Sequence, residues 1–348
     1  MSMKKNISIR SKNQLDLHSS DIDAVVLWVD GNDAEWQKKR SQYMPEEDCD
    51  SSPNRYRDWD NLRYWFRGIA KFAPWVNKIH FVTDGQTPEW LNIDHPRIFL
   101  VDHKDYMPPD ALPVFNSNAI EIGMHKISGL ADRFILFNDD VFLTAPVDPE
   151  YYFSQGTPVD MAGLTRPATR ETVFGSLMMN NYEILNRRFS KKEALKKNFS
   201  KWFCPRYGKN FVRTLMNLRT SEFQGIVIPH LSVPYRKSDI SRVWDQEGEL
   251  LQKTQYHRFR SPDDITHLLF RFWRLAEGDF KPRKSKGKYF SAENYQSVEK
   301  IAEAIVAQRY PEICINDCYQ GEDFEKAKNL LISSFEKILG DKCEYEKA

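Results

Sequence analysis

The residues best suited to chemistry in this sequence are two adjacent aspartates, Asp139 and Asp140, preceded by Asn138. They follow the apolar run 133–137 and precede a second apolar stretch, so they lie where a buried strand is expected to end. Paired carboxylates at that position offer the hard oxygen ligands that Mg²⁺ and Mn²⁺ prefer, and such an ion can hold a diphosphate. Asn and Asp are also frequent in ordinary turns, which is the structural alternative. We predict a site for Mg²⁺ or Mn²⁺ at Asp139 and Asp140.

A second group of polar residues follows the apolar run 23–29, where Trp28 leads into a turn that contains Asp30, Gly31 and Asp33. Glycine allows another group to approach the backbone closely, and a carboxylate in such a turn can hold a ribose hydroxyl or a base edge. The alternative is a well-capped turn in which Asp33 begins a helix. The residues alone favour neither interpretation.

Two arginines, Arg63 and Arg67, are four residues apart in an expected helix and therefore share one of its faces. Paired guanidinium groups suit phosphate recognition, because each can donate bidentate hydrogen bonds. A solvated helix face shared with Asp60 is the alternative, and on this pair alone it is favoured.

Proton transfer and charge stabilisation have candidates in the second half of the chain. His230 follows a proline in a short proline-rich stretch, and a neutral imidazole can take the proton of a hydroxyl group near neutral pH. Seven other histidines compete for this role, His125 foremost among them. Arg258 and Arg260 stand just before an expected helix and can neutralise charge that develops on a transferred phosphoryl group.

Asn316 and Asp317 repeat the apolar-then-Asn-Asp pattern late in the chain, directly after Ile315. They form either a second set of ligands for the same metal or only another turn. The sequence contains neither the glycine-rich phosphate loop that ends in Lys-[Ser/Thr] nor Gly-x-Gly-x-x-Gly, so a P-loop and a dinucleotide fingerprint are not supported.

The elements that must position these groups are four apolar runs bounded by turn residues: 23–29, 78–83, 97–101 and 133–137. Helical spacing marks 58–72 and 118–127 between them. Strands that alternate with helices predict an α/β fold with a Rossmann-like, mostly parallel sheet. Ligands gather at the carboxyl ends of such strands, and here those ends carry Asp30, Asp84 and the triplet 138–140.

The rest of the chain is mostly helical by pattern. Residues 165–225 form a basic, aromatic and mainly helical insertion, and further helices are expected at 262–277, 292–309 and 322–339. Residues 1–20 are polar and are expected to form a flexible lead-in. We therefore expect one α/β domain over 21–320, followed by a C-terminal helix within 321–348.

Composition limits location and partners. Lys and Arg number 50 against 49 Asp and Glu, so no overall field favours nucleic acid. The five cysteines are scattered, and no run has the length or apolarity of a signal peptide or a membrane span, so a cytoplasmic location is expected. Two basic runs, 187–201 and 281–288, suit an anionic acceptor or peripheral contact with the inner face of the cell membrane, and plain solvated surface is the alternative.

Four blocks of the sequence occur in an order that points to a known family. The first is Ile22 to Asp33, and the second runs from Arg55 to Asp140 through Val82-Thr-Asp-Gly-Gln86 and Phe115-Asn-Ser117. The third joins Pro229-His230 to Arg258-Phe-Arg260, and the fourth is Cys314 to Asp317. Together they resemble the Stealth family, which includes bacterial capsular polysaccharide phosphotransferases and the animal GlcNAc-1-phosphotransferase.

The resemblance implies a GT-A-like catalytic domain that moves a hexose or N-acetylhexosamine 1-phosphate from a UDP-sugar to a hydroxyl of an oligosaccharide or lipid-linked glycan. The products are a phosphodiester and UMP, in capsular or cell-surface polysaccharide synthesis. By similarity, the metal and diphosphate ligands are Asp139, Asp140, Asn316 and Asp317. The donor-site residues are Trp28, Asp30, Gly31, Asp33, Arg63 and Asp84, and the catalytic residues are Glu121, His230 and Arg260. Gly123-Met124 and Cys318 depart from the family pattern, which leaves the choice of acceptor open.

Two other functions are compatible with these residues. A conventional metal-dependent glycosyltransferase would use the same carboxylates and release UDP. A binding module without enzymatic activity would instead act through the two basic runs and would keep its partner after loss of Asp139 and Asp140.

Overall fold

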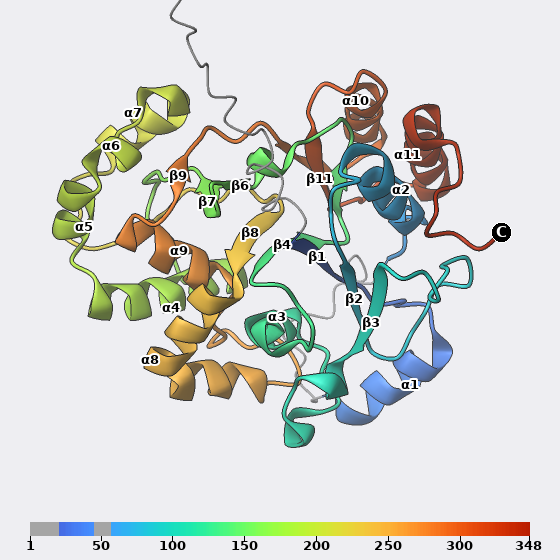
Figure 1. The fold of residues 1–348 in the computed structure, drawn as a ribbon, viewed down its shortest axis with the longest axis horizontal. Coiled ribbons are helices and arrows are strands. Elements are labelled where there is room, and N and C mark those ends of the chain that lie inside the picture. Colours follow the sequence, from blue (N-terminus) through green and yellow to red (C-terminus); the bar gives the residue numbers. More distant parts are fainter. Residues whose placement is uncertain (1–20, 45–56) are drawn as a thin grey trace, which may run out of the picture.

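A computed structural model describes residues 21–44 and 57–348. The expected lead-in 1–20, together with Cys49, Arg55 and Tyr56, lies outside these residues. A five-stranded sheet crosses the middle of the molecule, with helices on both of its faces (Figure 1). The predicted α/β fold with a Rossmann-like, mostly parallel sheet is thereby confirmed.

The strands of this sheet lie in the order β3-β2-β1-β4-β8. The first four are parallel, and β8 runs antiparallel to β4. Their bounds are β1 Ile22–Leu27, β2 Ile79–Thr83, β3 Ile98–Asp102, β4 Arg133–Asn138 and β8 Val233–Arg236. The order 3-2-1-4 is that of the first four strands of a Rossmann fold, and the carboxyl ends of these parallel strands meet at one edge of the sheet.

Two hydrophobic cores explain why the strands read as continuous apolar runs. Along β4, Phe134 and Leu136 enter one core while Ile135 and Phe137 enter the other, because successive side chains point to opposite faces. The first core is closed by α3 Ser117–Ile122, α4 Val173–Arg188, α8 Lys237–Gln255 and α9 Leu268–Glu277. The second is closed by α2 Leu62–Phe72, α10 Tyr295–Val306 and α11 Phe324–Leu339.

A second, three-stranded sheet joins distant parts of the chain. It has the order β10-β11-β5, with bounds Lys288–Ala292, Glu312–Asp317 and Val141–Leu143. β11 runs antiparallel to β5, and Cys314 lies opposite Val141. The end of β11 is therefore held beside the turn that connects β4 to β5.

The segment between the central strands β4 and β8 holds most of the remaining helices. After β5 come β6 Phe153–Ser154 and β7 Thr157–Asp160, and then α4, α5 Lys191–Lys197, α6 Phe199–Trp202 and α7 Lys209–Met216. β9 Lys281–Pro282, from beyond β8, pairs with β7 and completes a small sheet. The helix α1 Ala34–Tyr43 follows β1. Residues of α11 pack in the same core as α2, so the C-terminal helix is part of the packed molecule.

All five helices whose bounds were expected are shorter than the sequence pattern indicated, and in three of them the structure shows the reason. α2 begins at Leu62 and not at 58, because Asp60 has a left-handed backbone (φ 53°) that a right-handed helix cannot contain. The expected helix 118–127 is divided at Gly123 into α3 and a short 3₁₀ turn. α9 begins at Leu268 and not at 262, because the preceding residues form a turn around the buried side chain of Asp264.

No helix within 21–44 or 57–348 has both the length and the apolarity that crossing a bilayer requires.

Candidate active site

The carboxyl edge of the parallel strands opens onto three adjoining hollows. The central cleft, of about 670 Å³, is lined by Trp28, Glu121, Asp139, Asp140, Arg260, Asn316 and Asp317 among others. The β1–β2 pocket, of about 660 Å³, shares Trp28 and Trp36 with the cleft and adds Asp30, Asp33 and Asp84. The His230 pocket, of about 290 Å³, shares Glu121, Asp140, Arg260 and Asn316 with the cleft. Residues from all four sequence blocks therefore line one connected surface.

The two adjacent aspartates lie at the tip of the β4–β5 turn and face the central cleft. Desolvation by the cleft walls, together with the neighbouring charge of Asp140, raises the pKa of Asp139 to about 7. Desolvation also raises the pKa of Asp140 to about 6. Negative charge is thus costly at this position until a cation balances it.

The turn is held in place by β11. The backbone N–H of Ile315 donates to the Asp140 carbonyl at 2.9 Å, and the Cys314 thiol donates to Asp140 Oδ2 at 3.3 Å. This pairing carries Asn316 and Asp317 to the same cleft, although they follow Asp140 by more than 170 residues in the chain.

The side chains at this position supply only some of the ligands that a divalent ion needs. Over residues 21–44 and 57–348, no three His, Cys, Asp or Glu side chains gather closely enough to hold a metal by themselves. Asp140 Oδ1 and Asp317 Oδ2 are, however, buried oxygens that accept no hydrogen bond from the described residues, although Arg57 Nε lies 3.5 Å from Asp317 Oδ2 as an ion-pair partner. Mg²⁺ needs only one or two protein carboxylates when substrate phosphates and water supply its other ligands, so these two oxygens fit that requirement.

Glu121 and Arg260 face each other where the cleft meets the His230 pocket. Burial raises the pKa of the Glu121 carboxyl to about 7, and the positive charge of Arg260 partly opposes that rise. Arg260 Nη2 donates to Ser117 Oγ at 2.8 Å, and His267 Nε2 lies 3.7 Å from Glu121 Oε2. The pKa of His267 is lowered to about 3 by burial, so this imidazole is neutral and contributes no cation beside Glu121.

The loop that carries Arg260 is fastened to the start of α3 by a buried carboxylate. Asp264, fully buried, accepts from Asn116 Nδ2 at 2.8 Å and Asn118 Nδ2 at 3.1 Å, and its other oxygen lies 2.6 Å from His257 Nδ1. The same Asn116 amide donates to the carbonyl of Phe259 at 3.3 Å. Arg260 and Glu121 are therefore positioned relative to each other by one hydrogen-bond network.

His230 has the backbone of a constrained residue. Its φ of 53° is in the left-handed region, which non-glycine side chains rarely adopt and which is most often retained at functional sites. Its ring lies between Phe174, at 5.8 Å, and Tyr289, at 5.0 Å between centroids. His230 is exposed as a whole residue, but the surrounding side chains desolvate its imidazole, and the charge of Arg271 adds to that effect. Both lower the pKa of His230 below its usual value.

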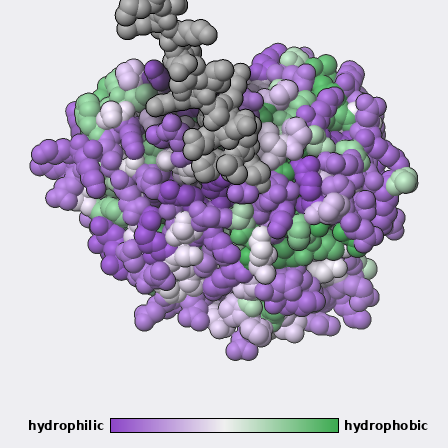
Figure 2. All heavy atoms as spheres, in the orientation of Figure 1, coloured by the Kyte–Doolittle hydropathy of each residue, from purple (hydrophilic) through white to green (hydrophobic). Residues whose placement is uncertain are grey.

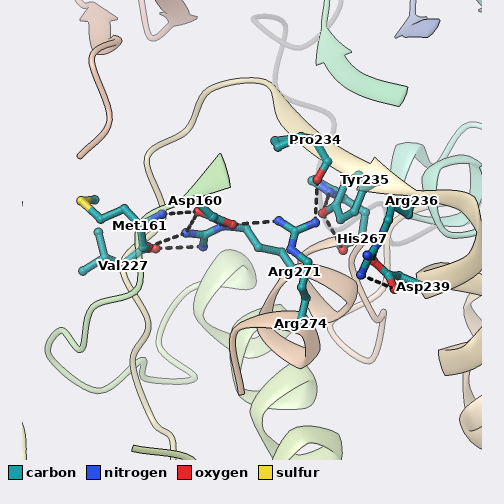
Figure 3. A network of polar contacts seen from close by, with 10 residues as sticks. All are labelled: Asp160, Met161, Val227, Pro234, Tyr235, Arg236, Asp239, His267, Arg271 and Arg274. Carbon is teal, nitrogen blue, oxygen red and sulfur yellow. Dashed lines mark hydrogen bonds and ion pairs between the residues drawn. The ribbon is translucent and has the colours of Figure 1, made fainter. Parts of the chain in front are cut away.

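The floor beside the His230 pocket is a buried ion network (Figure 3). Arg271 Nη2 and Arg274 Nη2, both from α9, lie 2.8 Å and 2.9 Å from the Asp160 carboxylate. The carbonyls of Val227 and Pro234 accept further hydrogen bonds from the two guanidinium groups. Two arginines against one aspartate leave a surplus positive charge under the pocket, which favours an anionic ligand there.

The residues after β1 form the capped turn that the sequence offered as one of two interpretations. Asp33 caps α1, because its Oδ1 accepts from the N–H groups of Glu35 and Trp36, and this is the helix start that the sequence offered as an alternative. Its Oδ2 accepts from Gln86 Nε2 at 3.0 Å. The Gln86 side chain also accepts from the Asp30 N–H and donates to the Asp30 carbonyl. The β1 and β2 ends are thus joined into one wall of the β1–β2 pocket.

The other residues expected to bind the donor have different surroundings. Asp84 lines the β1–β2 pocket and forms an ion pair with Lys39 of α1. Gly31 is buried, and its carbonyl accepts from Gln37 Nε2 at 2.7 Å. Arg63 lines none of the three hollows, since it lies over the Trp90 ring at 5.3 Å and 3.5 Å from Glu346.

Two more residues considered from the sequence also lie outside these hollows. His125 is buried against Trp244, and burial lowers its pKa to about 4. Arg258 donates to the carbonyls of Asp110 and Leu112, which holds the loop but does not face the cleft.

Several lining residues were not singled out from the sequence. Arg57 and Asp58 line the central cleft, and Arg57 Nε lies 3.5 Å from Asp317 Oδ2. Ser117 holds Arg260, and Gln86 joins the strand ends. Gln86, Asp58 and Ser117 all lie within the second sequence block, so the block itself was the signal that could have identified them.

Comparison with known proteins identifies the family. Conserved region 1 of the Stealth proteins matches residues 20–48, and conserved region 2 matches residues 55–160. Among solved structures, the galactosyltransferase LgtC covers 89% of this chain and 95% of its own at 10% identity, with a TM-score of 0.36, which is too weak a similarity to support any inference.

Curated relatives match over nearly the full length. The chain is 38% identical to the capsular polysaccharide phosphotransferase WcwK of Streptococcus pneumoniae over 94% of this chain and 98% of that protein. It is 39% identical to the receptor polysaccharide phosphotransferase WefC of Streptococcus gordonii, over 93% and 98% of the two chains. Because such relatives span nearly the whole of both chains and two conserved regions match, this protein belongs to the Stealth family, together with these bacterial polysaccharide phosphotransferases.

Proposed function

We propose that this protein transfers a hexose or N-acetylhexosamine 1-phosphate from a UDP-sugar to a hydroxyl of an acceptor glycan in capsular or cell-surface polysaccharide synthesis. The observation that carries the proposal is the meeting of Asp139, Asp140 and Asp317 with Arg260 in the cleft that adjoins His230. The phosphotransferase names of the full-length relatives support the same chemistry.

The donor has a suitable place across the β1–β2 pocket and the central cleft. Trp28 and Trp36 line both hollows and offer aromatic surface for a base. Asp30 and Asp84 offer carboxylates for ribose or base hydrogen bonds. The diphosphate would then lie toward Asp139 and Asp140. Asp140 and Asp317, with Asp139 and Asn316 beside them, would hold Mg²⁺ or Mn²⁺ there, and the bound ion would supply charge that neutralises the diphosphate.

The reaction exchanges one phosphorus–oxygen bond for another. The acceptor oxygen forms a bond to the sugar-bearing phosphorus, and the bond between this phosphorus and the oxygen of UMP breaks, so that UMP carries away the bonding electron pair. His230 accepts the proton of the acceptor hydroxyl, since its lowered pKa keeps the imidazole neutral at pH 7. Arg260 stabilises charge on the transferred phosphate, and Glu121 attracts Arg260 toward the reacting centre.

The acceptor has a suitable place in the His230 pocket. Its rim carries Arg283, Lys284 and Lys286 from the second basic run, and Phe174 and Tyr289 offer flat surfaces on which a sugar ring can stack. A phosphate-bearing oligosaccharide or lipid-linked glycan on the cytoplasmic side of the membrane fits this charge. The first basic run lines none of the three hollows.

The released nucleotide tests the proposal. The protein is incubated with a panel of UDP-sugars, Mg²⁺ and acceptor, and UMP is the expected product. UDP as the product would instead identify a conventional glycosyltransferase. EDTA should abolish release, and Mg²⁺ or Mn²⁺ should restore it. Full activity after extensive dialysis against EDTA would contradict the metal role.

A matched pair of variants tests the site itself. Asp140→Asn should lower kcat by about 10²–10³, the usual effect of removing a key electrostatic group. Asp132→Asn is the control, because Asp132 precedes the opposite end of the same strand β4 and holds the N–H of Ser238. Equal activity of the two variants would exclude the cleft as the site of transfer.

A further inference from the structure

The short helix α7 has its amphipathic pattern reversed. Its buried side chains are Asn210 and Thr214, both polar. Thr214 Oγ1 accepts from the Leu164 N–H at 3.0 Å, and Asn210 Nδ2 donates to Met161 Sδ at 3.3 Å. The most deeply buried positions are therefore polar. Of the apolar residues of the helix, Phe211 packs against a small cluster with Tyr207 and Val227, and the other three face outward.

The outward face is strongly apolar. Val212, Leu215 and Met216 are 53%, 45% and 75% exposed, and their i, i+3, i+4 spacing places them on one side of α7. Phe199 of α6 is 62% exposed and Leu218, just beyond α7, is 39% exposed. The corresponding region of Figure 2 shows an apolar patch over α7, surrounded by polar atoms. We call these five side chains the α6–α7 face.

The charges around this face have one sign. Residues 196–219 contain seven Lys or Arg and no Asp or Glu. Among these, Lys209 and Arg213 on α7 itself and Arg206 just before it are exposed. Exposed apolar side chains within a ring of cations are the chemistry of a segment that lies in the interface of an anionic bilayer.

We propose that the α6–α7 face docks the protein onto an anionic lipid membrane. Val212, Leu215 and Met216 enter the boundary between headgroups and acyl chains, while Lys209 and Arg213 contact the headgroup phosphates. Gly208, at the start of α7, lies close to Lys284 on the rim of the His230 pocket. Docking would therefore bring the mouth of that pocket near the membrane surface, where a lipid-linked acceptor is held.

Vesicle co-sedimentation tests this proposal without an activity assay, so its failure is distinct from failure of the proposed reaction. The full chain should sediment with vesicles that contain phosphatidylglycerol and much less with pure phosphatidylcholine, and added salt should weaken binding. The triple variant Val212→Ser, Leu215→Ser, Met216→Ser should bind at least about tenfold more weakly, because three apolar side chains no longer leave water.

The matched control changes three other exposed apolar residues. Ile93, Leu100 and Val306 are 42%, 42% and 40% exposed and lie outside the α6–α7 face, so their serine variant should bind like the unchanged protein. If the α7 triple variant proves unfolded by circular dichroism, Lys209→Glu with Arg213→Glu tests the same face and should also weaken binding.

Two results would overturn the proposal. One is binding of the α7 variants at the level of the unchanged protein. The other is the absence of vesicle binding, with concentration-dependent self-association that only the α7 variants lose. In that case the face joins two copies of the chain and does not contact lipid.

Discussion

At the scale of single residues, the central question is which group takes the acceptor proton. Glu121 and His230 line the same pocket, but burial shifts their pKa values in opposite directions. It raises the pKa of the Glu121 carboxyl to about 7 and lowers the pKa of the His230 imidazole. At pH 7 the histidine is therefore mostly in its basic form, whereas about half of the glutamate is protonated.

The pH dependence of kcat distinguishes the two. A base must be deprotonated to act, so with His230 as the base kcat falls only as the pH drops through a value below 6.5. With Glu121 as the base, the fall is already centred near pH 7. His230→Ala should lower kcat by about 10²–10⁴ while donor affinity, measured by direct binding, stays the same. An inactive Glu121→Gln beside a fully active His230→Ala would assign the base to the carboxylate.

At the scale of elements, the active site depends on how a loop and a helix are joined. Arg260 comes from the loop before α9, and Glu121 and Ser117 come from α3. Asp264 connects them, because one buried carboxylate accepts hydrogen bonds from the α3 side and from the loop. It acts through Arg260 and is a positioning residue.

Neighbouring aspartates allow a direct test. Asp264→Asn leaves the donors of Asn116 and Asn118 without a charged acceptor, so the free energy of unfolding should fall by about 1.5–3 kcal/mol. Displacement of Arg260 should lower kcat by about 10–10² with a smaller change in the KM of the donor. Asp263→Asn is the control, since Asp263 is exposed and should change neither value. Thermal unfolding and steady-state kinetics check both, and a stable Asp264→Asn enzyme with unchanged kcat would contradict the positioning role.

At the scale of the whole molecule, the two basic runs occupy separate places in the fold. The run 281–288 reaches the rim of the His230 pocket, whereas the run 187–201 lies on the helical segment away from it. Composition and net charge do not distinguish the two runs, because both are rich in Lys and Arg. Their places in the fold differ, and for this reason we propose acceptor binding only for the run at the pocket rim.

Charge removal in the two runs should therefore have unequal effects. Lys284→Gln with Lys286→Gln should raise the KM for a soluble phosphorylated oligosaccharide several-fold and weaken its dependence on salt, because exposed cations attract an anionic ligand through screened fields. Lys192→Gln with Lys196→Gln, equally exposed, should leave both unchanged. Identical salt dependence in both variants would show that the pocket rim does not select for charge.

The sequence by itself determined the parallel sheet, the strand ends and the order of the four blocks. Apolar runs such as 133–137 are local signals, because a strand buried on both faces must be apolar at every position. The turn after β1 was also local, since capping by Asp33 involves residues only two and three positions away. Helix starts were less certain, as the left-handed backbone of Asp60 shows.

Only the tertiary structure decided which polar groups share a site and in which state of protonation. Asn316 and Asp317 reach Asp140 through pairing of β11 with β5, which the pattern of either segment does not encode. By residue type, Arg63 was as suitable for phosphate binding as Arg260, but in the folded chain it packs against Trp90, outside the cleft. The raised pKa of Glu121 and the outward apolar face of α7 depend on burial, and burial is a property of surroundings that are distant in sequence and meet only on folding.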